Sequence, residues 1–258
     1  MPPLTPRLPR ALRAVVIVSI LAAGACSADR PNLAEVPERL PTTELTTTTT
    51  TPEPPSEMVA QAVAPSIDVF ESETIAAPMR QVVSGVDTSV STIPIVFLVK
   101  SVGVSRVEVY LPVRPNGSIG WVDKAAVTIT EVPYRVEVDL AAHRIRVFDG
   151  FDTIVDEPVG VGRTDRPTPG GIYYLKELLQ PPSPNGPYGT YAYGLSGFSN
   201  VLESFNGGPG VIGIHGTNDP AAVGSDVSSG CIRLNNDVIN RLVNEIGLPL
   251  GTPVTINA

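Results

Sequence analysis

The sequence is poor in the residues that build metal sites and in aromatic side chains. Its 258 residues include two histidines, two cysteines and one tryptophan. Neither a Cys-x-x-Cys pair nor a histidine-rich tract supplies a set of ligands, so we expect neither a metal ion nor another cofactor. Positive charge is also scarce, with 18 Lys and Arg against 26 Asp and Glu and a formal net charge of −8. This balance argues against nucleic acid as a partner, because nucleic-acid-binding proteins present basic faces.

Proline and glycine are abundant, with 27 and 23 residues. Together with many Val, Ile and Thr residues, they favour short strands and turns over a helical bundle. The length suits one or two compact domains with tails. We therefore expect a mostly β protein.

The first 26 residues are typical of an export signal. A basic head with Arg7, Arg10 and Arg13 precedes an apolar run over residues 14–25. This run is too short for an ordinary transmembrane helix, so residues 1–25 are predicted to be a signal peptide. The string Ala-Gly-Ala-Cys that ends at Cys26 resembles a bacterial lipobox, although Ala23 stands where leucine is usual. The resemblance implies a lipidated Cys26 and an exported, membrane-anchored protein; the alternative is nearby cleavage and release.

Residues 26–57 form a low-complexity segment of Thr, Pro and Glu. Such a segment buries too little apolar surface to offset its ordering entropy. We predict a disordered tether that spans tens of ångströms.

Residues 58–132 are predicted to be a small β module. Apolar residues alternate or run together at residues 95–99, 102–111, 121–122 and 127–130, and an Asn-Gly pair at residues 116–117 predicts a tight turn. The segment from residue 58 to residue 75 has no clear period. Trp121 is either a core residue, which is the commoner case on a short strand, or a contact for wall glycan.

Residues 133–258 have the pattern of a larger β domain. A hairpin is predicted over residues 134–150, followed by strands at 153–161 and 168–175. His143 lies near the turn of the hairpin and is either a surface residue, which is the commoner case, or a base. Residues 180–210 are rich in Pro, Gly, Ser and Asn and are predicted to be a long irregular loop. Strands at 211–214 and 248–256 flank a helix near residues 235–247. The loop holds Tyr188, Tyr191 and Tyr193, which either line a cleft or pack.

The chemistry-bearing residues gather in one glycine-rich stretch, His-Gly-Thr-Asn-Asp-Pro-Ala-Ala-Val-Gly-Ser-Asp-Val-Ser-Ser-Gly-Cys-Ile-Arg, from His215 to Arg233. A thiol nucleophile needs a base, and a thin backbone admits a substrate carbonyl. The alternatives are a structural cysteine beside a loop histidine, or a disulfide between Cys26 and Cys231. A lipid on Cys26 would leave Cys231 without a partner.

This stretch resembles the signature of the L,D-transpeptidase (YkuD-type) catalytic domain. Residues 134–175, including the turn Arg-Pro-Thr-Pro-Gly-Gly at 166–171, are similar to the opening of that domain. The resemblance implies a β-sandwich catalytic domain over residues 133–258, and the string around Trp121 resembles the SH3-like modules that precede it in actinobacterial wall proteins. It also implies that Cys231 is the nucleophile and His215 the base. The backbone of Gly216 would orient His215, and the amides of Gly230 and Cys231 would bind the oxyanion.

Two further positions of the motif carry expectations. Arg233 either binds a carboxylate of the peptide stem or forms a salt bridge. Ser229 stands where the commoner motif has histidine, so the polarity beside the nucleophile is altered; a serine offers one hydrogen bond and no charge.

The resemblance also implies the substrate. Members of the family cleave the bond between an L-centred diamino acid and D-Ala in a peptidoglycan tetrapeptide stem, then transfer the acyl group to an amine of a neighbouring stem in a 3→3 cross-link. They are sensitive to carbapenems. Two other functions stay open, an L,D-carboxypeptidase that uses water and a non-catalytic wall-binding lipoprotein. The residues alone indicate only a thiol acyltransferase or hydrolase.

Overall fold

The computed structural model describes residues 55–83, 93–205 and 207–258. The chain divides into two units, residues 1–50 and 51–258, and all described residues belong to the second. The predicted signal peptide, Cys26 and nearly all of the tether lie outside the described residues. Within the described residues, no helix is long and apolar enough to cross a membrane.

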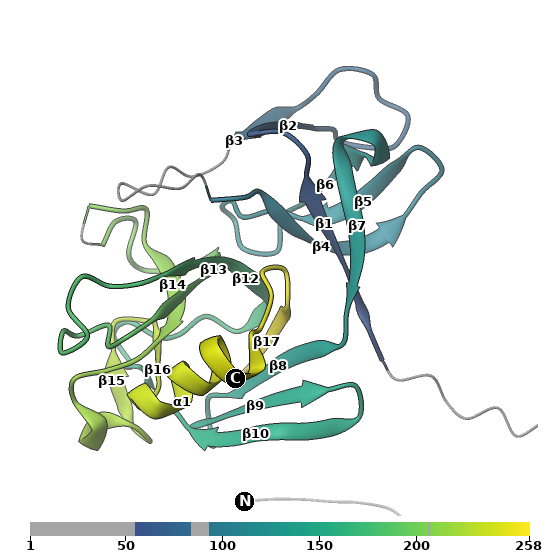
Figure 1. Ribbon diagram of the computed structural model, residues 1–258. Helices are drawn as coiled ribbons and strands as arrows, with labels where there is room; N and C mark the ends of the chain where they lie inside the picture. Colours follow the sequence, from purple (N-terminus) through teal and green to yellow (C-terminus); the bar gives the residue numbers. More distant parts are fainter. Residues whose placement is uncertain (1–54, 84–92, 206) are drawn as a thin grey trace, which may run out of the picture. The chain divides into compact units, whose positions relative to one another are not determined.

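The first part of the described chain folds into a five-stranded antiparallel sheet in the order β6-β5-β4-β1-β7 (Figure 1). Its strands are β1 (Glu57–Ala62), β4 (Val96–Val102), β5 (Arg106–Tyr110), β6 (Ile119–Asp123) and β7 (Val127–Val132). Side chains of alternating positions, among them Phe97, Val107 and Val122, form its core. The strands predicted from the alternation are all present.

The segment whose period was unclear contributes a strand to this sheet and one to a hairpin. β1 lies between β4 and β7, while β2 (Ser66–Val69) pairs with β3 (Arg80–Val83). Trp121 is half-buried on β6 and lies outside the buried core cluster, so the core interpretation of this residue is wrong. Its backbone pairs with that of Phe70.

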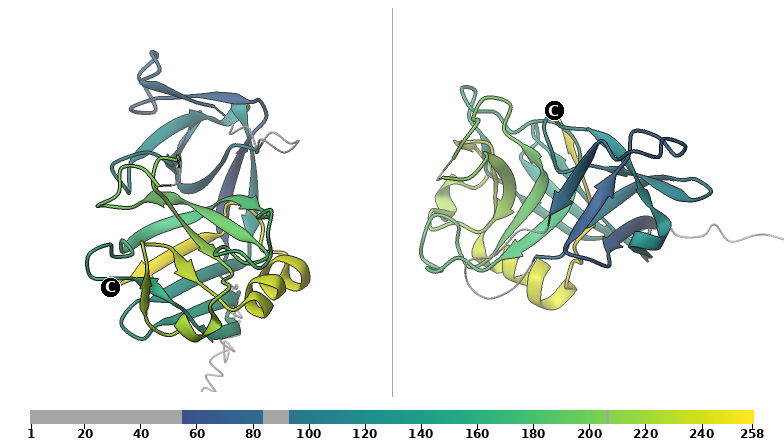
Figure 2. Two further views of the ribbon diagram at one scale, coloured as in Figure 1. Left: turned by 90° about the vertical axis from the view of Figure 1, so that its left-hand side faces the viewer. Right: turned by 90° about the horizontal axis from the view of Figure 1, so that it is seen from above.

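The rest of the chain forms an eight-stranded sheet in the order β10-β9-β8-β17-β12-β13-β14-β16. Its strands are β8 (Tyr134–Asp139), β9 (Arg144–Asp149), β10 (Asp152–Pro158), β12 (Gly171–Leu179), β13 (Ala192–Phe198), β14 (Val211–His215), β16 (Ile232–Arg233) and β17 (Pro253–Asn257). The sheet curls, as the two views in Figure 2 show, and one apolar core serves both halves: Val138 and Ile145 from one, Leu195 and Ile214 from the other. The mostly β fold class is confirmed.

The prediction of a continuous irregular loop over residues 180–210 is wrong, because its middle forms β13. The strand reads Ala-Tyr-Gly-Leu-Ser-Gly-Phe, a composition that suggests a loop. Small residues are required there because neighbouring side chains occupy the space. A Cβ atom on Gly197 would overlap the ring of Tyr173, a buried residue of β12.

The predicted helix is present. α1 (Asn236–Asn240) begins after Asn235 and continues into a π-helical turn, Arg241–Ile246, that ends at Gly247 with φ 68°. Ile239 and Leu242 are buried in the core of the curled sheet, so the helix closes one side of that core. Two short strands, β11 (Val161–Gly162) and β15 (Asp226–Ser228), pair in parallel and anchor the stretch that leads to Cys231.

Candidate active site

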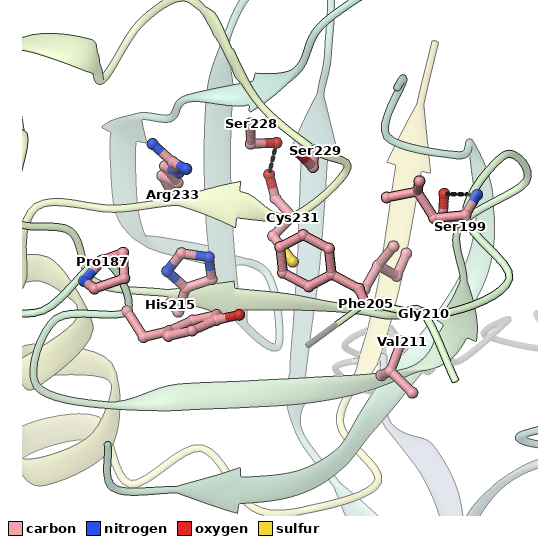
Figure 3. A pocket seen from close by; sticks show the side chains of 13 residues that line it. Pro187, Ser199, Phe205, Gly210, Val211, His215, Ser228, Ser229, Cys231 and Arg233 are labelled. Atoms are coloured by element: carbon pink, nitrogen blue, oxygen red, sulfur yellow. Dashed lines mark hydrogen bonds between the residues drawn. The ribbon is translucent and has the colours of Figure 1, made fainter. Parts of the chain in front are cut away.

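The end of the curled sheet brings His215 and Cys231 together. β14 and β16 run in parallel, with Ile214 opposite Ile232 and His215 opposite Arg233. His215 is the last residue of β14 and Cys231 immediately precedes β16, so the two residues stand on neighbouring strands. Their side chains line the same pocket, together with Phe205 and Arg233 (Figure 3). The predicted pair is therefore assembled by backbone pairing.

The ring of His215 is held in one orientation. Its Nδ1 atom lies 2.6 Å from the carbonyl oxygen of Gly216. Because a carbonyl only accepts hydrogen bonds, Nδ1 carries the proton and Nε2 keeps its lone pair. Tyr188 meets the ring edge-on, with centroids 4.9 Å apart and an interplanar angle of 62°. The backbone contact expected of Gly216 is present.

Burial keeps both reacting groups uncharged. His215 is 4% exposed, and desolvation lowers its pKa to about 4, an effect that the charge of Arg233 reinforces and the hydrogen bond to Gly216 opposes. Burial also raises the pKa of the Cys231 thiol, while the N–H of Gly213 and the charge of Arg233 act in the lowering direction. At neutral pH the site therefore holds a neutral imidazole beside a thiol.

A serine hydroxyl fixes the turn before the nucleophile. Ser228 Oγ donates to the carbonyl oxygen of Cys231 at 2.6 Å and accepts from the N–H of Gly230 at 3.0 Å. Gly230 has φ 118°, a conformation that side-chain-bearing residues rarely adopt. The N–H of Gly230, which the sequence suggested as an oxyanion donor, is thus engaged within its own turn. Sequence reasoning missed Ser228, although its place three residues before Cys231 suits a local turn bond.

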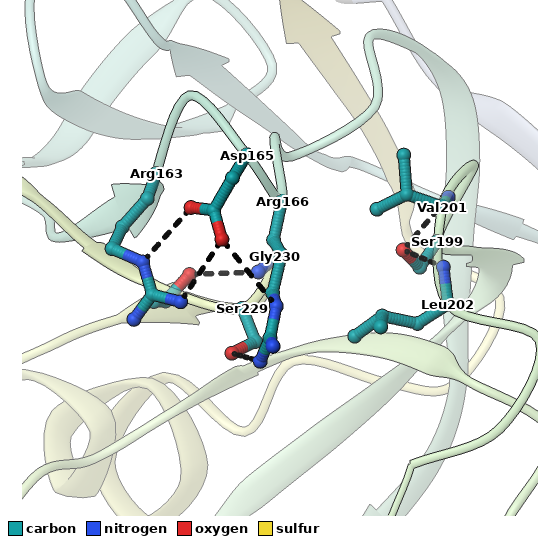
Figure 4. Close-up of polar contacts among 9 residues, drawn as sticks. Arg163, Asp165, Arg166, Ser199, Val201, Leu202, Ser229 and Gly230 are labelled. Carbon is teal, nitrogen blue, oxygen red and sulfur yellow. Dashed lines mark hydrogen bonds and ion pairs between the residues drawn. The ribbon is translucent and has the colours of Figure 1, made fainter.

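Ser229 lies beside the nucleophile and has a cationic neighbour. The guanidinium of Arg166 donates from Nη1 to Ser229 Oγ at 3.3 Å (Figure 4). Asp165 pairs with Arg163 at 3.1 Å and with Arg166 at 3.6 Å, so the three residues form one network. A positive charge near this position therefore comes from a side chain 63 positions away along the chain. Local spacing could not reveal it.

Arg233 faces the pocket with part of its hydrogen-bonding capacity unused. Its Nε atom is buried and has no partner among the described residues, and no described carboxylate forms an ion pair with this side chain. Its backbone is fixed on both sides, by hydrogen bonds with Gly160 and by pairing beside His215. Of the two interpretations offered by the sequence, the salt bridge is absent from the described residues.

Two hollows meet at the reacting residues. We call the first the arginine hollow; it has a volume of about 110 Å³ and contains Arg233, Ser228 and Ser229. We call the second the glutamate hollow; it has a volume of about 480 Å³ and contains Glu177. Tyr188, Phe205, His215 and Cys231 line both. A peptide could therefore reach Cys231 from two sides.

Residues 199–205 and 207–210, which we call the rim loop, form part of the wall of the two hollows. Ser199, Leu202, Phe205 and Gly210 line the arginine hollow. The ends of the loop meet where the N–H of Ser199 donates to the carbonyl of Gly210 at 2.8 Å, and the hydroxyl of Ser199 accepts from the N–H of Leu202 at 3.1 Å. Figure 4 shows this serine with the start of the loop.

Side chains from the loop between β5 and β6 hold the rim loop and the strand before it. Arg114 donates to the carbonyl oxygens of Ser199 at 2.6 Å, Leu202 at 2.9 Å and Pro209 at 3.1 Å. Asn116 exchanges two hydrogen bonds with the backbone of Phe198, at 2.7 and 2.9 Å. The sequence predicted only a tight turn at residues 116–117. It did not predict these contacts, because they join distant parts of the chain.

The three tyrosines and the second histidine named from the sequence lie in different surroundings. Tyr188 lines both hollows, whereas Tyr191 packs against the domain core. Tyr193 is buried with its hydroxyl donating to Leu248 O at 3.2 Å, and burial raises its pKa to about 12. His143 lies outside both hollows and pairs with Asp226 at 2.8 Å, which favours the surface-turn interpretation over the base.

The described residues contain no group of three or more His, Cys, Asp or Glu side chains placed to hold a metal ion. The chemistry available here is that of a thiol, an imidazole and backbone hydrogen-bond donors. Such a set can form and resolve a thioester.

Comparison with known proteins agrees with this chemistry. The family model of the L,D-transpeptidase catalytic domain (YkuD) matches residues 133–256. The protein named L,D-transpeptidase YkuD in Bacillus subtilis is 33% identical over 126 residues, which cover 49% of this chain and 67% of that protein. Its namesake in Bacillus licheniformis is 33% identical over 125 residues, which cover 48% of this chain and 66% of that protein.

The chain thus spans about two thirds of the length of these curated relatives. A crystal structure of L,D-transpeptidase 3 from Mycobacterium tuberculosis aligns at 16% identity with a TM-score of 0.39, covering 61% of this chain and 94% of that one. On the strength of the sequence matches over the domain that contains His215 and Cys231, the chain belongs to the YkuD family of L,D-transpeptidase catalytic domains.

Proposed function

We propose that this protein is a cysteine L,D-transpeptidase that forms 3→3 cross-links between peptidoglycan stems. The observation that carries the proposal is the fixed ring of His215, which keeps a free Nε2 lone pair in the pocket that also holds the Cys231 thiol. Family membership supports the substrate class, a tetrapeptide stem. The two hollows support a reaction with two peptides, because each offers its own approach to Cys231.

The first half of the reaction forms a thioester. His215 Nε2 takes the thiol proton of Cys231, and the sulfur attacks the carbonyl carbon of the third stem residue. The C–N bond to the terminal D-Ala breaks, and the proton on His215 passes to the departing amine. The backbone N–H of Cys231 stabilises the oxyanion, an effect usually about 10²- to 10³-fold in rate.

The second half transfers the acyl group. A neutral side-chain amine of a second stem attacks the thioester carbon, and its proton passes to His215. The C–S bond then breaks, and the sulfur recovers its proton from the imidazolium. Because the imidazole has a low pKa in the free site, it returns the proton readily.

Hydrolysis is the second candidate function. Water could take the place of the amine in the same thioester, which would make the protein an L,D-carboxypeptidase. The two hollows favour transfer, because a second peptide can approach Cys231 by the one that the donor leaves open. A wall-binding protein without activity would need neither the fixed imidazole nor the thiol.

The test is product analysis with a tetrapeptide donor and an excess of a second stem as acceptor. We expect release of D-Ala together with a cross-linked dimer, and neither product from Cys231→Ala. Release of D-Ala with tripeptide alone, at every acceptor concentration, would identify the carboxypeptidase. No release by the wild type would overturn both enzymatic functions.

We also propose that the chain works outside the cytoplasmic membrane, held by a lipid on Cys26. Residues 1–25 would be the signal peptide, 26–57 the tether, 58–132 the small SH3-like module and 133–258 the catalytic domain. The composition of the first 57 residues supports this assignment. Mass spectrometry of the mature protein should find a diacylglyceryl group on Cys26, and Cys26→Ser should release the protein from membranes. A mature protein with an unmodified Cys26 would contradict the anchor.

A further inference from the structure

The two hollows that meet at Cys231 differ in charge. Among the described lining residues, Arg233 is the only Lys, Arg, Asp or Glu of the arginine hollow, and Glu177 is the only one of the glutamate hollow. The rest of the glutamate hollow is largely apolar, with Leu179 and Ile212 among its lining residues. An apolar channel with one carboxylate suits an alkyl chain that ends in a cation.

The sheet places this carboxylate on a line with the nucleophile. Glu177 on β12 pairs with Gly194 on β13, and Gly194 pairs with Gly213 on β14. The N–H of Gly213 in turn faces the Cys231 sulfur. Because Gly194 and Gly213 have no side chains, only bare backbone lies between the carboxylate and the thiol. We call this backbone the floor.

The side chain of Glu177 lies over this floor. A Cβ atom on Gly194 would overlap the carboxylate of Glu177 and would lie 2.7 Å from its Cγ. The carboxylate therefore lies over β13, the strand between β12 and β14. A register shift between Leu175 and Glu177, which leaves Lys176 as the extra residue of β12, sets this placement.

The distance along the floor matches a diamino acid. The Glu177 carboxylate lies over β13, so one strand spacing of about 4.8 Å separates it from the backbone of Gly213, and the hydrogen bond from Gly213 to the sulfur adds roughly 3.5 Å. In an extended lysine residue, the nitrogen of the side chain is about 7 Å from the carbonyl carbon. With an ion pair of about 3 Å, such a residue is long enough to bridge the carboxylate and Cys231.

We propose that Glu177 binds the side-chain ammonium of the diamino residue whose carbonyl is attacked by Cys231. This inference rests on the proposed function and names the part of the donor stem that the glutamate hollow recognises. Glu177 is then a specificity-determining residue that contacts the substrate but takes no part in bond making.

A neighbouring lysine competes for the carboxylate. Lys176 Nζ lies 3.1 Å from Glu177 Oε1, and the two side chains are 27% and 18% exposed. Lys176 does not line the hollow, so it approaches the carboxylate from outside it. Partly exposed pairs of this kind are weak, and a substrate ammonium can bind the second oxygen or displace the lysine.

The experiment compares two donor tetrapeptides that differ only at the third residue, which is lysine or Nε-acetyl-lysine. Acetylation removes the charge and keeps the alkyl chain. Hydrogen bonds to charged groups contribute enough for us to expect wild-type kcat/KM to be about tenfold higher for lysine. In Glu177→Gln, which keeps the shape of the side chain, this ratio should fall close to one, because the preference for the charged side chain is lost.

Two further variants complete the design. Glu157→Gln on β10 removes one carboxylate from the same domain outside both hollows, and the ratio should stay at the wild-type value. Lys176→Met removes the competitor, so the ratio should hold or rise. An unchanged ratio in Glu177→Gln, or a ratio near one in Lys176→Met, would overturn the inference.

The proposed function fails in a different way. If the wild type cleaves neither tetrapeptide, the proposed activity on stem peptides is wrong, and the inference about Glu177 is wrong as well. If the wild type cleaves both peptides equally, the activity stands and only the role of Glu177 is overturned.

Discussion

The two walls of the cleft are built in different ways. The catalytic wall carries His215 at the end of β14 and Cys231 just before the neighbouring strand β16, where the backbone ladder sets their separation. The opposite wall is the rim loop, which is held mainly by side chains of Arg114 and Asn116 from the loop between β5 and β6. The reacting groups therefore depend on local pairing, whereas the shape of the space before them depends on a second region of the chain.

This contrast separates chemistry from substrate fit. Changes on the catalytic wall should affect the acylation of any reagent, because they alter the nucleophile or its base. Changes at the contacts of the rim loop should affect large peptide substrates and leave small acylating reagents nearly unaffected. The predictions below test that separation.

The largest effect is expected at the base. His215→Gln removes the proton acceptor, so kcat should fall about 10²- to 10⁴-fold for stem peptides and acylation by a carbapenem should slow by a similar factor. Stopped-flow mass measurement of the adduct and steady-state peptide kinetics provide the two values. Equal rates in the variant and the wild type would show that His215 is not the base.

The burial of His215 should also make folding depend on pH. The pKa of this group is about 4 in the folded chain and 6.5 as an ordinary histidine. Between these pH values His215 is protonated in the unfolded chain and neutral in the folded chain. The free energy of unfolding therefore falls as the pH falls. The free energy of unfolding should decrease by about 3 kcal/mol from pH 7 to pH 4 because of this group.

Urea unfolding at several pH values measures this dependence. The same series in His215→Gln should lack this part of the slope, because the variant has no titrating group at the site. The same slope in both proteins would contradict the burial argument.

The rim loop should give a smaller and more selective effect. Arg114→Ala with Asn116→Ala loosens the loop, so kcat/KM for stem peptides should fall about tenfold, mostly through KM. The rate of carbapenem acylation should stay within about twofold. Arg135→Ala is the matched control, since Arg135 also donates to a backbone carbonyl, that of Gly150, and covers the ring of Phe148. A parallel loss of peptide turnover and acylation would show that the walls are not separable.

The smallest effect is expected beside the nucleophile. Ser229→Ala removes the acceptor for Arg166 but leaves the charge nearby, so alkylation of Cys231 by iodoacetamide should slow about two- to threefold. Ser225→Ala in the same stretch is the control, since its hydroxyl bonds only the carbonyl of Ala222. A loss above about a hundredfold would mean that Ser229 takes part in the reaction.

The same contrast explains what the sequence could predict. His215, Cys231 and the backbone role of Gly216 follow from one short stretch, and the pairing of two strands is enough to bring them together. The alternation of apolar residues likewise predicts most strands, and the asparagine start and glycine end predict the helix. These features depend on residues close together along the chain.

The rim loop and the glutamate hollow depend on contacts that local patterns do not contain. Arg114 and Asn116 bond residues 82 to 95 positions away. β13 was predicted to be loop because Gly194 and Gly197 are small for reasons that lie on β12, where Glu177 and Tyr173 occupy the space. Tertiary packing outweighs residue propensity at such positions.

The central claim is that Cys231 is the nucleophile of an acyl-transfer site. The most direct test is the intact mass of the protein after incubation with a carbapenem, with Cys231→Ala treated in the same way. We predict that the wild type gains the mass of one carbapenem, located by peptide mapping on Cys231, and that the variant gains none. A wild-type protein that stays unmodified while Cys231 remains free and titratable, or an adduct that persists in Cys231→Ala, would contradict the claim.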